Sequence, residues 1–284
     1  MSVVIPTRDR PDQLRTAVRS ILDGAVVPAE IVVADQSRSP SALEPRADGG
    51  SLVHLHLDEV GLSRGRNAGL AAASHDFVAF VDDDVVVAPD WLARVVDAMR
   101  AAPPRTIVTG AVLPTDAPGV TPSVTSSTEP RLFTRRPGLD PLFGNNVALP
   151  RSIVDDVGPF DVRLGAGAPF PSAEDNDFGF RALEAGYAIQ FVPDAIVWHA
   201  GARTGADVRR LEWAYGRGQG GFYAKHLHLR DHYMFVQFGR NVAERLRHPR
   251  REGIYLAALL VGTAEWLVRY RLGRLCRGGI DSRT

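Results

Sequence analysis

Three consecutive aspartates, Asp82, Asp83 and Asp84, follow the apolar run "FVAFV". Neighbouring carboxylates repel one another, so three of them at the end of a buried strand indicate that a positive partner is expected. Mg²⁺ and Mn²⁺ bind carboxylate oxygens and often bridge them to the phosphates of a substrate. The triplet therefore predicts a clamp for a metal-bound diphosphate. The alternative is that Asp83 or Asp84 simply begins a turn before the next helix, since short motifs often arise without a function.

A second acidic cluster, formed by Glu174, Asp175 and Asp177, begins a predicted helix in "EDNDFGFR". The helix dipole favours carboxylates at this position, so one explanation is helix capping. Three carboxylates exceed what a cap needs. A carboxylate whose pKa is raised by its surroundings can act as a general base, and this cluster is the candidate for that role.

His199 stands in "VWHAG", at the end of a predicted strand. A single histidine is most often packed or solvated. Beside a carboxylate-bound cation, however, a histidine at a strand end can serve as a further metal ligand.

The elements that carry these residues alternate between strands and helices. Strand patterns cover residues 2–6, 29–35, 52–57 and 77–81, and helix patterns cover residues 11–22, 61–74 and 89–102. This alternation predicts an α/β fold with a parallel sheet, in which ligands bind beyond the carboxyl ends of the strands. Asp35 and the aspartate triplet both stand at such ends.

The chain changes character after residue 103. Residues 114–142 are rich in Pro, Thr and Ser, and they predict a loop over the site rather than a linker, because patterned sequence resumes after them. A helix and a strand follow, and the remaining chain is helical, basic and aromatic. We therefore expect a main domain over residues 1–202 and a helical extension over residues 203–284.

Composition and charge restrict the protein class. The 284-residue chain has 45% hydrophobic and 23% charged residues, which is typical of a soluble globular protein. Its one cysteine, Cys276, excludes a disulfide within the chain and leaves a cysteine metal site without support. Residues 1–202 carry 17 Lys and Arg against 26 Asp and Glu, and residues 203–284 carry 16 against 7. The basic tail predicts an anionic partner such as lipid or diphosphate, with a solvated arginine-rich surface as the alternative.

The two ends of the chain bear on its location. The start, "MSVVIPTRDR", has no basic region followed by a long apolar stretch, so we expect no signal peptide and a cytoplasmic location. The apolar stretch from Gly253 to Tyr270 is interrupted by Glu265 and is too short and polar to predict a spanning helix.

The same stretch is flanked by arginines, and Tyr255 and Trp266 near its ends suit a membrane interface. It predicts a helix that lies on anionic lipid at the inner face of the plasma membrane. The alternative is a helix that packs on the main domain or on a second copy of the chain. The apolar face is predicted to contain Leu256, Leu259, Leu260, Thr263 and Leu267.

Seven segments in order make the chain resemble glycosyltransferase family 2, the nucleotide-sugar transferases of the type A fold. They are "VVIPTRDRPDQLRTAVRSIL", "IVVADQS", "GLSRGRNAGL", "FVDDDV", "FGNNVALPRSIVDDVGPFD", "AEDNDFGFRALEAGY" and "VWHAG", and they extend over residues 2–201. The resemblance implies a Rossmann-like type A fold with a mostly parallel sheet, to which the sequence pattern adds the C-terminal helical extension. It also makes residues 1–202 the catalytic domain.

The resemblance assigns roles position by position. It implies that the donor is bound by Pro6, Thr7, Arg8, Asp35, Asp58, Arg64, Asn67, Asp82 and Asp83. It implies that the sugar or the acceptor is bound by Asn145, Asn146 and Glu174. It places a divalent metal, Mn²⁺ or Mg²⁺, on Asp82, Asp84 and His199, and it makes Asp175 the base.

The implied reaction is one displacement with inversion, in which one hexose or deoxyhexose passes from a nucleoside-diphosphate sugar to a hydroxyl. Cell-surface glycan, glycolipid and natural-product acceptors are all consistent with it, including a lipid-linked acceptor, and no nucleic-acid partner is expected. Ala34 stands before Asp35, where the family often has a second acidic residue. The preference for one nucleotide base over another therefore stays open. The chain lacks Gln-x-x-Arg-Trp, and the nearest segment is "QGGFY" from Gln219, which disfavours a processive synthase.

Other classes fit less well. A sugar-phosphate nucleotidyltransferase has a glycine-rich basic loop after its first strand, whereas "PTRDRPDQ" has no glycine. A non-catalytic module docked on membranes would not need the set of Asp82, Asp84, Asp175 and His199. A dinucleotide oxidoreductase needs Gly-x-Gly-x-x-Gly after the first strand, and the chain has none there.

Overall fold

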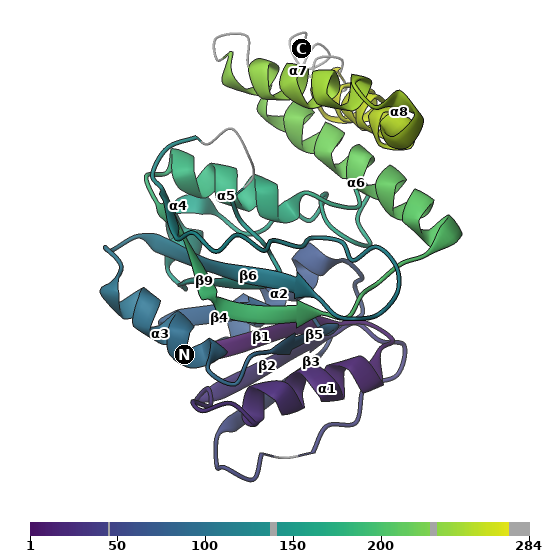
Figure 1. Ribbon diagram of the computed structural model, residues 1–284. Coiled ribbons are helices and arrows are strands. Elements are labelled where there is room, and N and C mark those ends of the chain that lie inside the picture. The colour runs from purple at the N-terminus through teal and green to yellow at the C-terminus, as the bar shows by residue number, and fades with distance from the viewer. Residues whose placement is uncertain (45, 137–140, 228–231, 273–284) are drawn as a thin grey trace, which may run out of the picture. The chain divides into compact units, whose positions relative to one another are not determined.

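Nine strands form one sheet in the computed structural model, which describes residues 1–44, 46–136, 141–227 and 232–272 (Figure 1). Their order is β3-β2-β1-β4-β8-β6-β9-β5, and β7 pairs with β9. The strands are β1 Ser2–Thr7, β2 Glu30–Asp35, β3 Ser51–His56, β4 Phe77–Val81, β5 Val85–Val87, β6 Thr106–Pro114, β7 Arg131–Phe133, β8 Asn146–Pro150 and β9 Ala188–His199. Six strands run in one direction, and β5, β7 and β8 run against them. The expected α/β fold with a mostly parallel sheet is therefore confirmed.

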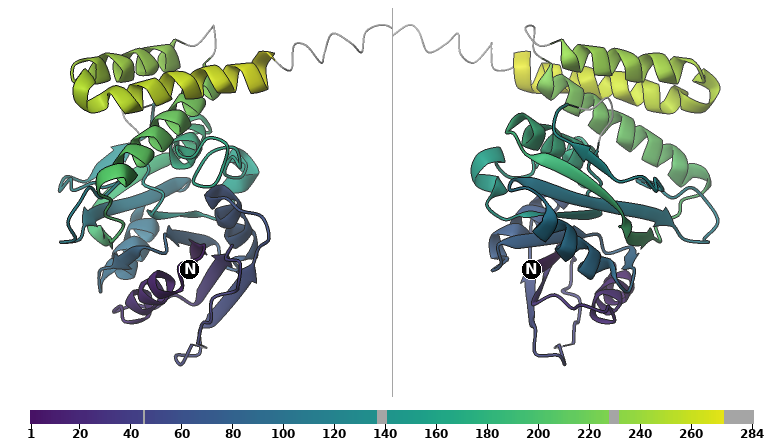
Figure 2. Two further views of the ribbon diagram at one scale, coloured as in Figure 1. Left: turned by 90° about the vertical axis from the view of Figure 1, so that its right-hand side faces the viewer. Right: turned by 60° about the vertical axis from the view of Figure 1, so that its left-hand side comes forward.

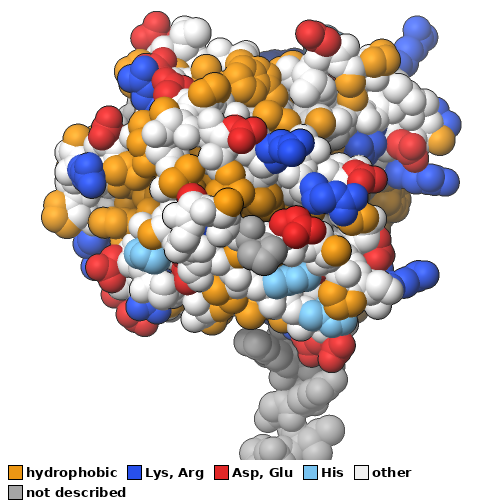
Figure 3. All heavy atoms as spheres, turned by 90° about the horizontal axis from the view of Figure 1, so that it is seen from below, with side chains coloured by type: hydrophobic (Ala, Val, Ile, Leu, Met, Phe, Trp, Pro, Cys, Tyr) orange, Lys and Arg blue, Asp and Glu red, His pale blue; other side chains and the backbone are white. Residues whose placement is uncertain are grey.

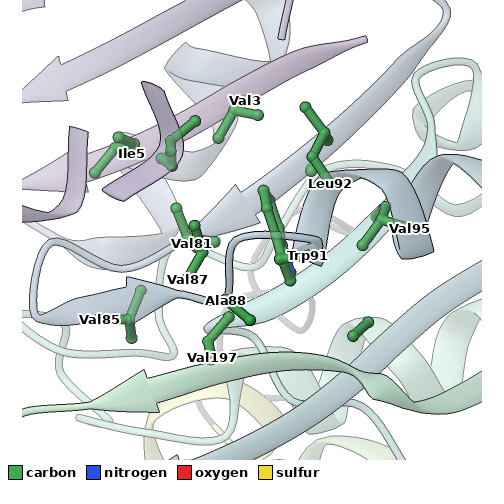
Figure 4. Packing of buried hydrophobic residues seen from close by; sticks show 14 of the residues in the cluster. Val3, Ile5, Val81, Val85, Val87, Ala88, Trp91, Leu92, Val95 and Val197 are labelled. Atoms are coloured by element: carbon green, nitrogen blue, oxygen red, sulfur yellow. The ribbon is translucent and has the colours of Figure 1, made fainter. Parts of the chain in front are cut away.

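Helices cover both faces of the sheet (Figure 1). They are α1 Pro11–Leu22, α2 Leu62–Ala72, α3 Trp91–Ala101, α4 Ile153–Val157 and α5 Glu174–Glu184. Successive side chains of a strand point to opposite faces, so Val3 and Val4 of β1 belong to two different cores. Val3 packs in the cluster that contains Trp91 of α3 together with apolar residues of α1, as Figure 4 shows for the labelled side chains. Val4 packs in the cluster of α2, α4 and α5, which contains Phe178.

Three short strands were not predicted from the sequence. One of them, β5, follows the aspartate triplet directly and pairs antiparallel with the end of β9, so that Val85 lies opposite His199. A three-residue strand has no periodicity that a sequence pattern can reveal, and its partner is distant in the chain. This pairing brings the end of the triplet beside the end of β9.

The described chain divides into two compact units. The first contains residues 1–162 and 175–204, and the second contains residues 163–174 and the chain from Gly205 onward. The helices of the second unit are α6 Gly205–His226, α7 Tyr233–Leu246 and α8 Pro249–Trp266, followed by the π-helix Leu267–Leu272. Figure 2 shows α7 and α8 side by side in both views. The functional division at residue 202 stays a prediction.

Glycines let α6 and α8 approach closely. A Cβ atom on Gly216 would lie 2.4 Å from the carbonyl oxygen of Tyr255, and one on Gly262 would lie 2.2 Å from the carbonyl oxygen of Arg217. No helix within the described ranges is long and apolar enough to cross a membrane.

The predicted apolar face of α8 was wrong in part. The buried residues of α8 are Ala258, Leu259, Gly262 and Trp266. Leu260, which we expected on the same face as Leu259, is instead 49% exposed. The small residues opposite the glycines of α6 determine which side of α8 is buried, and a pattern of leucines does not reveal that choice.

Candidate active site

The aspartate triplet lies at the carboxyl end of β4, beside the end of the neighbouring parallel strand β1. Thr7, the last residue of β1, donates a hydrogen bond from Oγ1 to Oδ2 of Asp83 over 2.7 Å. The triplet therefore stands at the carboxyl end of a strand, as expected. Burial raises the pKa of Asp83 to about 6, even though Arg10 and Thr7 both act to lower it.

Arg10 holds two carboxylates of the triplet at once. Its Nη1 atom lies 3.0 Å from Oδ1 of Asp83 and 3.0 Å from Oδ2 of Asp84. Burial lowers the pKa of Arg10, but the two carboxylates outweigh that effect and raise it. Arg10 was not among the predicted site residues. The predicted Arg8 is exposed, and its Nε lies 3.6 Å from Oδ2 of Asp9. Both arginines stand in "PTRDR", so the residue type alone did not distinguish them.

Asp84 and His199 form the other contact of the triplet. His199 Nε2 lies 3.2 Å from Oδ1 of Asp84, and Nδ1 lies 2.9 Å from the carbonyl oxygen of Pro122. A carbonyl can only accept, so Nδ1 carries a hydrogen and Nε2 faces the carboxylate. Burial lowers the pKa of His199, but the hydrogen bond and charge of Asp84 outweigh it and raise that pKa. Burial would raise the pKa of Asp84, and His199 and Arg10 lower it instead.

Asp82 has a different partner, Arg66, which sequence reasoning missed. Arg66 Nη2 lies 3.0 Å from Oδ1 of Asp82 and 3.0 Å from the carbonyl oxygen of Gly144. Its side chain is 1% exposed, and a fully buried arginine needs such anionic and carbonyl partners. Arg66 stands in "GLSRGRNAGL", but the resemblance assigned a role only to Arg64 and Asn67 of this segment.

The donor set at Asp84 and His199 fits a divalent cation. A carboxylate oxygen and an imidazole nitrogen converge there, and the other ring nitrogen is oriented by a backbone carbonyl, as is usual for a histidine ligand. In the described ranges, no group of three or more His, Cys, Asp or Glu side chains is arranged to hold a metal ion. Asp82 is therefore not gathered with the other two predicted ligands. Mg²⁺ and Mn²⁺ commonly complete such a set with substrate phosphates and water.

Asp35 lies at the carboxyl end of β2 and is fully buried. Its Oδ1 accepts the N–H of Ser37 over 2.9 Å, and its Oδ2 accepts the N–H of Ser41 over 2.7 Å and lies 3.0 Å from His54 Nε2. Burial alone would raise the pKa of Asp35, but these hydrogen bonds lower it to about 2. The carboxylate is therefore already engaged within the chain, and its contact with a nucleotide base stays a prediction.

Two predicted donor residues are bound to neighbouring protein groups. Arg64 pairs with Glu59, with Nη1 2.8 Å from Oε2. The amide of Asn67 is used by the backbone of Phe160, which it contacts through both Nδ2 and Oδ1 over 2.9 Å. Pro6 is buried within β1 and Asp58 is exposed.

The two predicted sugar-binding asparagines differ sharply. Asn146 is buried and structural in its contacts, since Nδ2 donates to the carbonyl oxygens of Ala111 and Ala195 and Oδ1 accepts from Trp91. The neighbouring Asn145 is also buried, but its Oδ1 has no hydrogen-bond partner among the residues that the structure describes. A buried acceptor without a partner is costly, so Asn145 is the better candidate for a ligand contact.

The three carboxylates of the second acidic cluster also differ in their surroundings. Asp175 Oδ2 accepts the N–H of Gly144 over 3.2 Å, so the peptide groups of Gly144 contact both Asp175 and Arg66. Asp177 is fully buried, and its Oδ2 accepts from Nε of Arg181 over 2.9 Å. Glu174 is buried and belongs to the second unit. Asp175 is thus connected through Gly144 to the residues around Asp82, whereas Asp177 stabilises α5.

Comparison with known proteins adds a family match. Residues 2–158 match the sequence model described as glycosyl transferase family 2. The chain is 25% identical over 178 residues to a glucosyl-dolichyl phosphate glucuronosyltransferase from Haloferax volcanii, covering 58% of this chain and 57% of that protein. It is 28% identical over 214 residues to a pre-mycofactocin glycosyltransferase from Mycobacterium tuberculosis, covering 70% and 42%. The chain spans about half the length of these curated relatives.

Solved structures share the fold. A mannosyltransferase from Pyrobaculum calidifontis, in complex with GDP-Man and Mn²⁺, is similar with a TM-score of 0.61 and 17% identity, covering 95% of this chain and 87% of that chain. Residues 1–349 of TarS from S. aureus, in complex with UDP-GlcNAc, give a TM-score of 0.56 and 14% identity, covering 96% and 91%. At these identities the likeness concerns the fold, which is the type A fold of glycosyltransferases.

Proposed function

Since the chain belongs to glycosyl transferase family 2, we propose that it transfers one sugar from a nucleoside-diphosphate sugar to a hydroxyl acceptor with inversion. The observation that carries this proposal is the Asp84–His199 pair at the carboxyl edge of the sheet, where a diphosphate-bound cation would find a carboxylate and an imidazole. The family favours this function over a sugar-phosphate nucleotidyltransferase or a non-catalytic module.

Asp84 and His199 would hold the divalent cation, which when bound offsets the charge that develops on the departing nucleoside diphosphate. Asp83, tied to Thr7, fixes the turn after β4 and so orients Asp84. Asp82 is held by Arg66 at the same edge and remains the candidate for a ribose contact.

Asp175 is proposed as the base. Its carboxylate, positioned by the N–H of Gly144, would accept the proton of the acceptor hydroxyl. The acceptor oxygen then forms a bond to the anomeric carbon as the bond from that carbon to the diphosphate oxygen breaks. One attack from the face opposite the leaving group inverts the configuration. The buried Oδ1 of Asn145 is the proposed partner of a sugar or acceptor hydroxyl.

The nucleotide and the metal can be tested together. We expect UDP or GDP, in the presence of Mn²⁺ or Mg²⁺, to raise the melting temperature of the protein, and chelator to abolish that rise. The matching sugar nucleotide should then release nucleoside diphosphate when acceptors are added. Absence of stabilisation by every nucleoside diphosphate with either metal would contradict the proposal.

We further propose a lipid-linked acceptor, reached from the cytoplasmic face of a membrane. One relative is named for action on glucosyl-dolichyl phosphate, and Leu260, Val261 and Val268 are exposed in the basic second unit. Pelleting with anionic but not with neutral vesicles is expected, and replacement of Leu260 and Val261 by serine should reduce it. Equal pelleting on both lipids, or none on either, would contradict membrane contact and leave packing or self-association as the role of this surface.

A further inference from the structure

Arg10 contacts the carboxylates of Asp83 and Asp84, beside which a divalent cation would bind. We infer that Arg10 is a built-in counter-ion that offsets part of the charge of Asp83 and Asp84 before the donor arrives, and that its guanidinium moves to the donor diphosphate as the divalent cation binds. The cation and the nucleoside diphosphate would then bind together rather than one after the other. The inference rests on the proposed metal-assisted binding of a nucleoside diphosphate.

The charge of the triplet is already offset in part by basic groups. Arg66 pairs with Asp82, Arg10 bridges Asp83 and Asp84, and His199 lies against the second oxygen of Asp84. Every carboxylate oxygen of Asp83 and Asp84 therefore has a partner, because Thr7 occupies Oδ2 of Asp83. A divalent cation that arrives alone must displace one of these partners, and the negative charge that would attract it is already offset in part by two arginines. Binding of the bare cation is thereby disfavoured.

Arg10 is the arginine that can move. Its side chain is 40% exposed, whereas that of Arg66 is 1% exposed. The backbone of Arg10 is held, since its carbonyl accepts the N–H of Leu14 at the start of α1 and Pro11 follows it. Only the side chain is therefore free to turn, and its guanidinium remains near the metal position whichever partner it takes.

A diphosphate gives Arg10 a new partner. Guanidinium groups match phosphate oxygens in charge and in geometry, commonly through two parallel hydrogen bonds. When the cation arrives with a diphosphate, Arg10 exchanges two carboxylates for phosphate oxygens and Asp84 becomes available to the metal. Each ligand therefore increases the affinity for the other, and this coupling is reciprocal.

The test compares Mn²⁺ binding by wild type, Arg10→Gln and a control, with the free Mn²⁺ signal in electron paramagnetic resonance as the readout. The control is Arg15→Gln, because Arg15 also pairs with an aspartate, Asp12, but on the exposed surface of α1. Without nucleotide, Arg10→Gln should bind Mn²⁺ at least about tenfold more tightly than wild type and the control. With UDP or GDP, the gain in Mn²⁺ affinity should be about tenfold larger in wild type than in Arg10→Gln.

A second variant, Arg10→Lys, keeps the charge but loses the planar fork. It should retain the weak binding of Mn²⁺ alone and lose most of the gain from the nucleotide. If Arg10→Gln binds Mn²⁺ alone as wild type does while wild type still binds Mn²⁺ with nucleotide, the exchange is refuted and the proposed function stands. In another outcome, Arg10→Gln binds Mn²⁺ more tightly than wild type, but neither UDP nor GDP changes the Mn²⁺ affinity of wild type. That result supports the counter-ion role of Arg10 and refutes both the move of its guanidinium to the diphosphate and the proposed function.

Discussion

His199 Nε2 lies 3.2 Å from Oδ1 of Asp84, although the two residues are far apart in the sequence. The antiparallel pairing of β5 with β9, in which Val85 lies opposite His199, creates this proximity. The carbonyl of Pro122 orients the ring from its other side. The candidate metal site therefore depends on a short strand and on a loop carbonyl as much as on the two ligands.

We predict that His199→Ala weakens metal-dependent nucleotide binding by about tenfold or more, because one of the two proposed protein ligands is lost. Isothermal titration with UDP or GDP and Mn²⁺ measures this. His75→Ala is the control, since His75 contacts Ser2 at the opposite end of β1. Equal nucleotide affinity in His199→Ala and wild type would exclude His199 as a ligand.

Asp175→Asn is predicted to lower turnover by about 10²–10⁴-fold, because the amide keeps the shape but cannot accept a proton. The affinity for nucleoside diphosphate should stay within about twofold of wild type, since the proposed general base acts on the acceptor. Steady-state rates and titration of the nucleotide separate the two effects. Loss of nucleotide binding with an unchanged rate at saturation would make Asp175 a binding residue.

Asp177→Asn is predicted to behave differently from Asp175→Asn. Asp177 is buried and pairs with Arg181, so its loss should lower the free energy of unfolding by about 1–3 kcal/mol. The turnover of the remaining folded enzyme should change little. Urea unfolding measures the free energy of unfolding. A large loss of turnover at unchanged stability would contradict a structural role for Asp177.

The glycine face of α6 should be intolerant of side chains. A Cβ atom on Gly218 would lie 2.1 Å from Oγ and 2.6 Å from the backbone N and O of Ser172, all within the second unit. Gly218→Ala is therefore predicted to lower the free energy of unfolding by about 1–3 kcal/mol. Gly239→Ala in α7 is the matched control, because nothing lies within 4 Å of its added Cβ, and it should be neutral or stabilising by up to about 1 kcal/mol. Equal stabilities of the two variants would contradict the close packing.

The pKa of Asp35 predicts a pH dependence of stability. In the folded state this pKa is about 2, below the ordinary 3.8. The ionised carboxylate therefore stabilises the fold by about 2 kcal/mol above pH 4, and this contribution is lost as the pH falls from 3.8 through 2. Urea unfolding of wild type and Asp35→Asn at pH 6 and pH 3 should show the difference between them shrinking by roughly half at the lower pH. An unchanged difference would show that the titration of Asp35 does not contribute.

Local sequence patterns predicted most of the elements. Residues 11–22 were expected to form a helix, and α1 has these bounds, because Pro11 suits a first helical turn and Leu14, Val18 and Ile21 recur at helical spacing. The strands before Asp35 and Asp82 were equally visible as short apolar runs. Such signals are contained within one element, so they can be read without knowing the partners of that element.

The partners of the site residues could not be predicted in this way. Nothing in "PTRDR" shows that Arg10 rather than Arg8 contacts the triplet, since that depends on the turn between β1 and α1. Asn146 and Asn67 carry polar groups suited to a ligand, yet their amides are used by distant backbone groups. Which polar atoms are left for a substrate is a property of the whole hydrogen-bond network.

The sequence alone therefore determined the α/β fold, the edge of the sheet that holds the candidate site, and the residue types available there. These follow from periodicity, from the direction of parallel strands and from the chemistry of carboxylates and imidazole. The tertiary structure determined the pairs Asp84–His199, Asp82–Arg66 and Asp83–Arg10, because each depends on strand register and on side chains from separate segments. Opposite charges compensate each other over a few ångströms in space, and the separation of two residues along the chain does not show whether they lie that close.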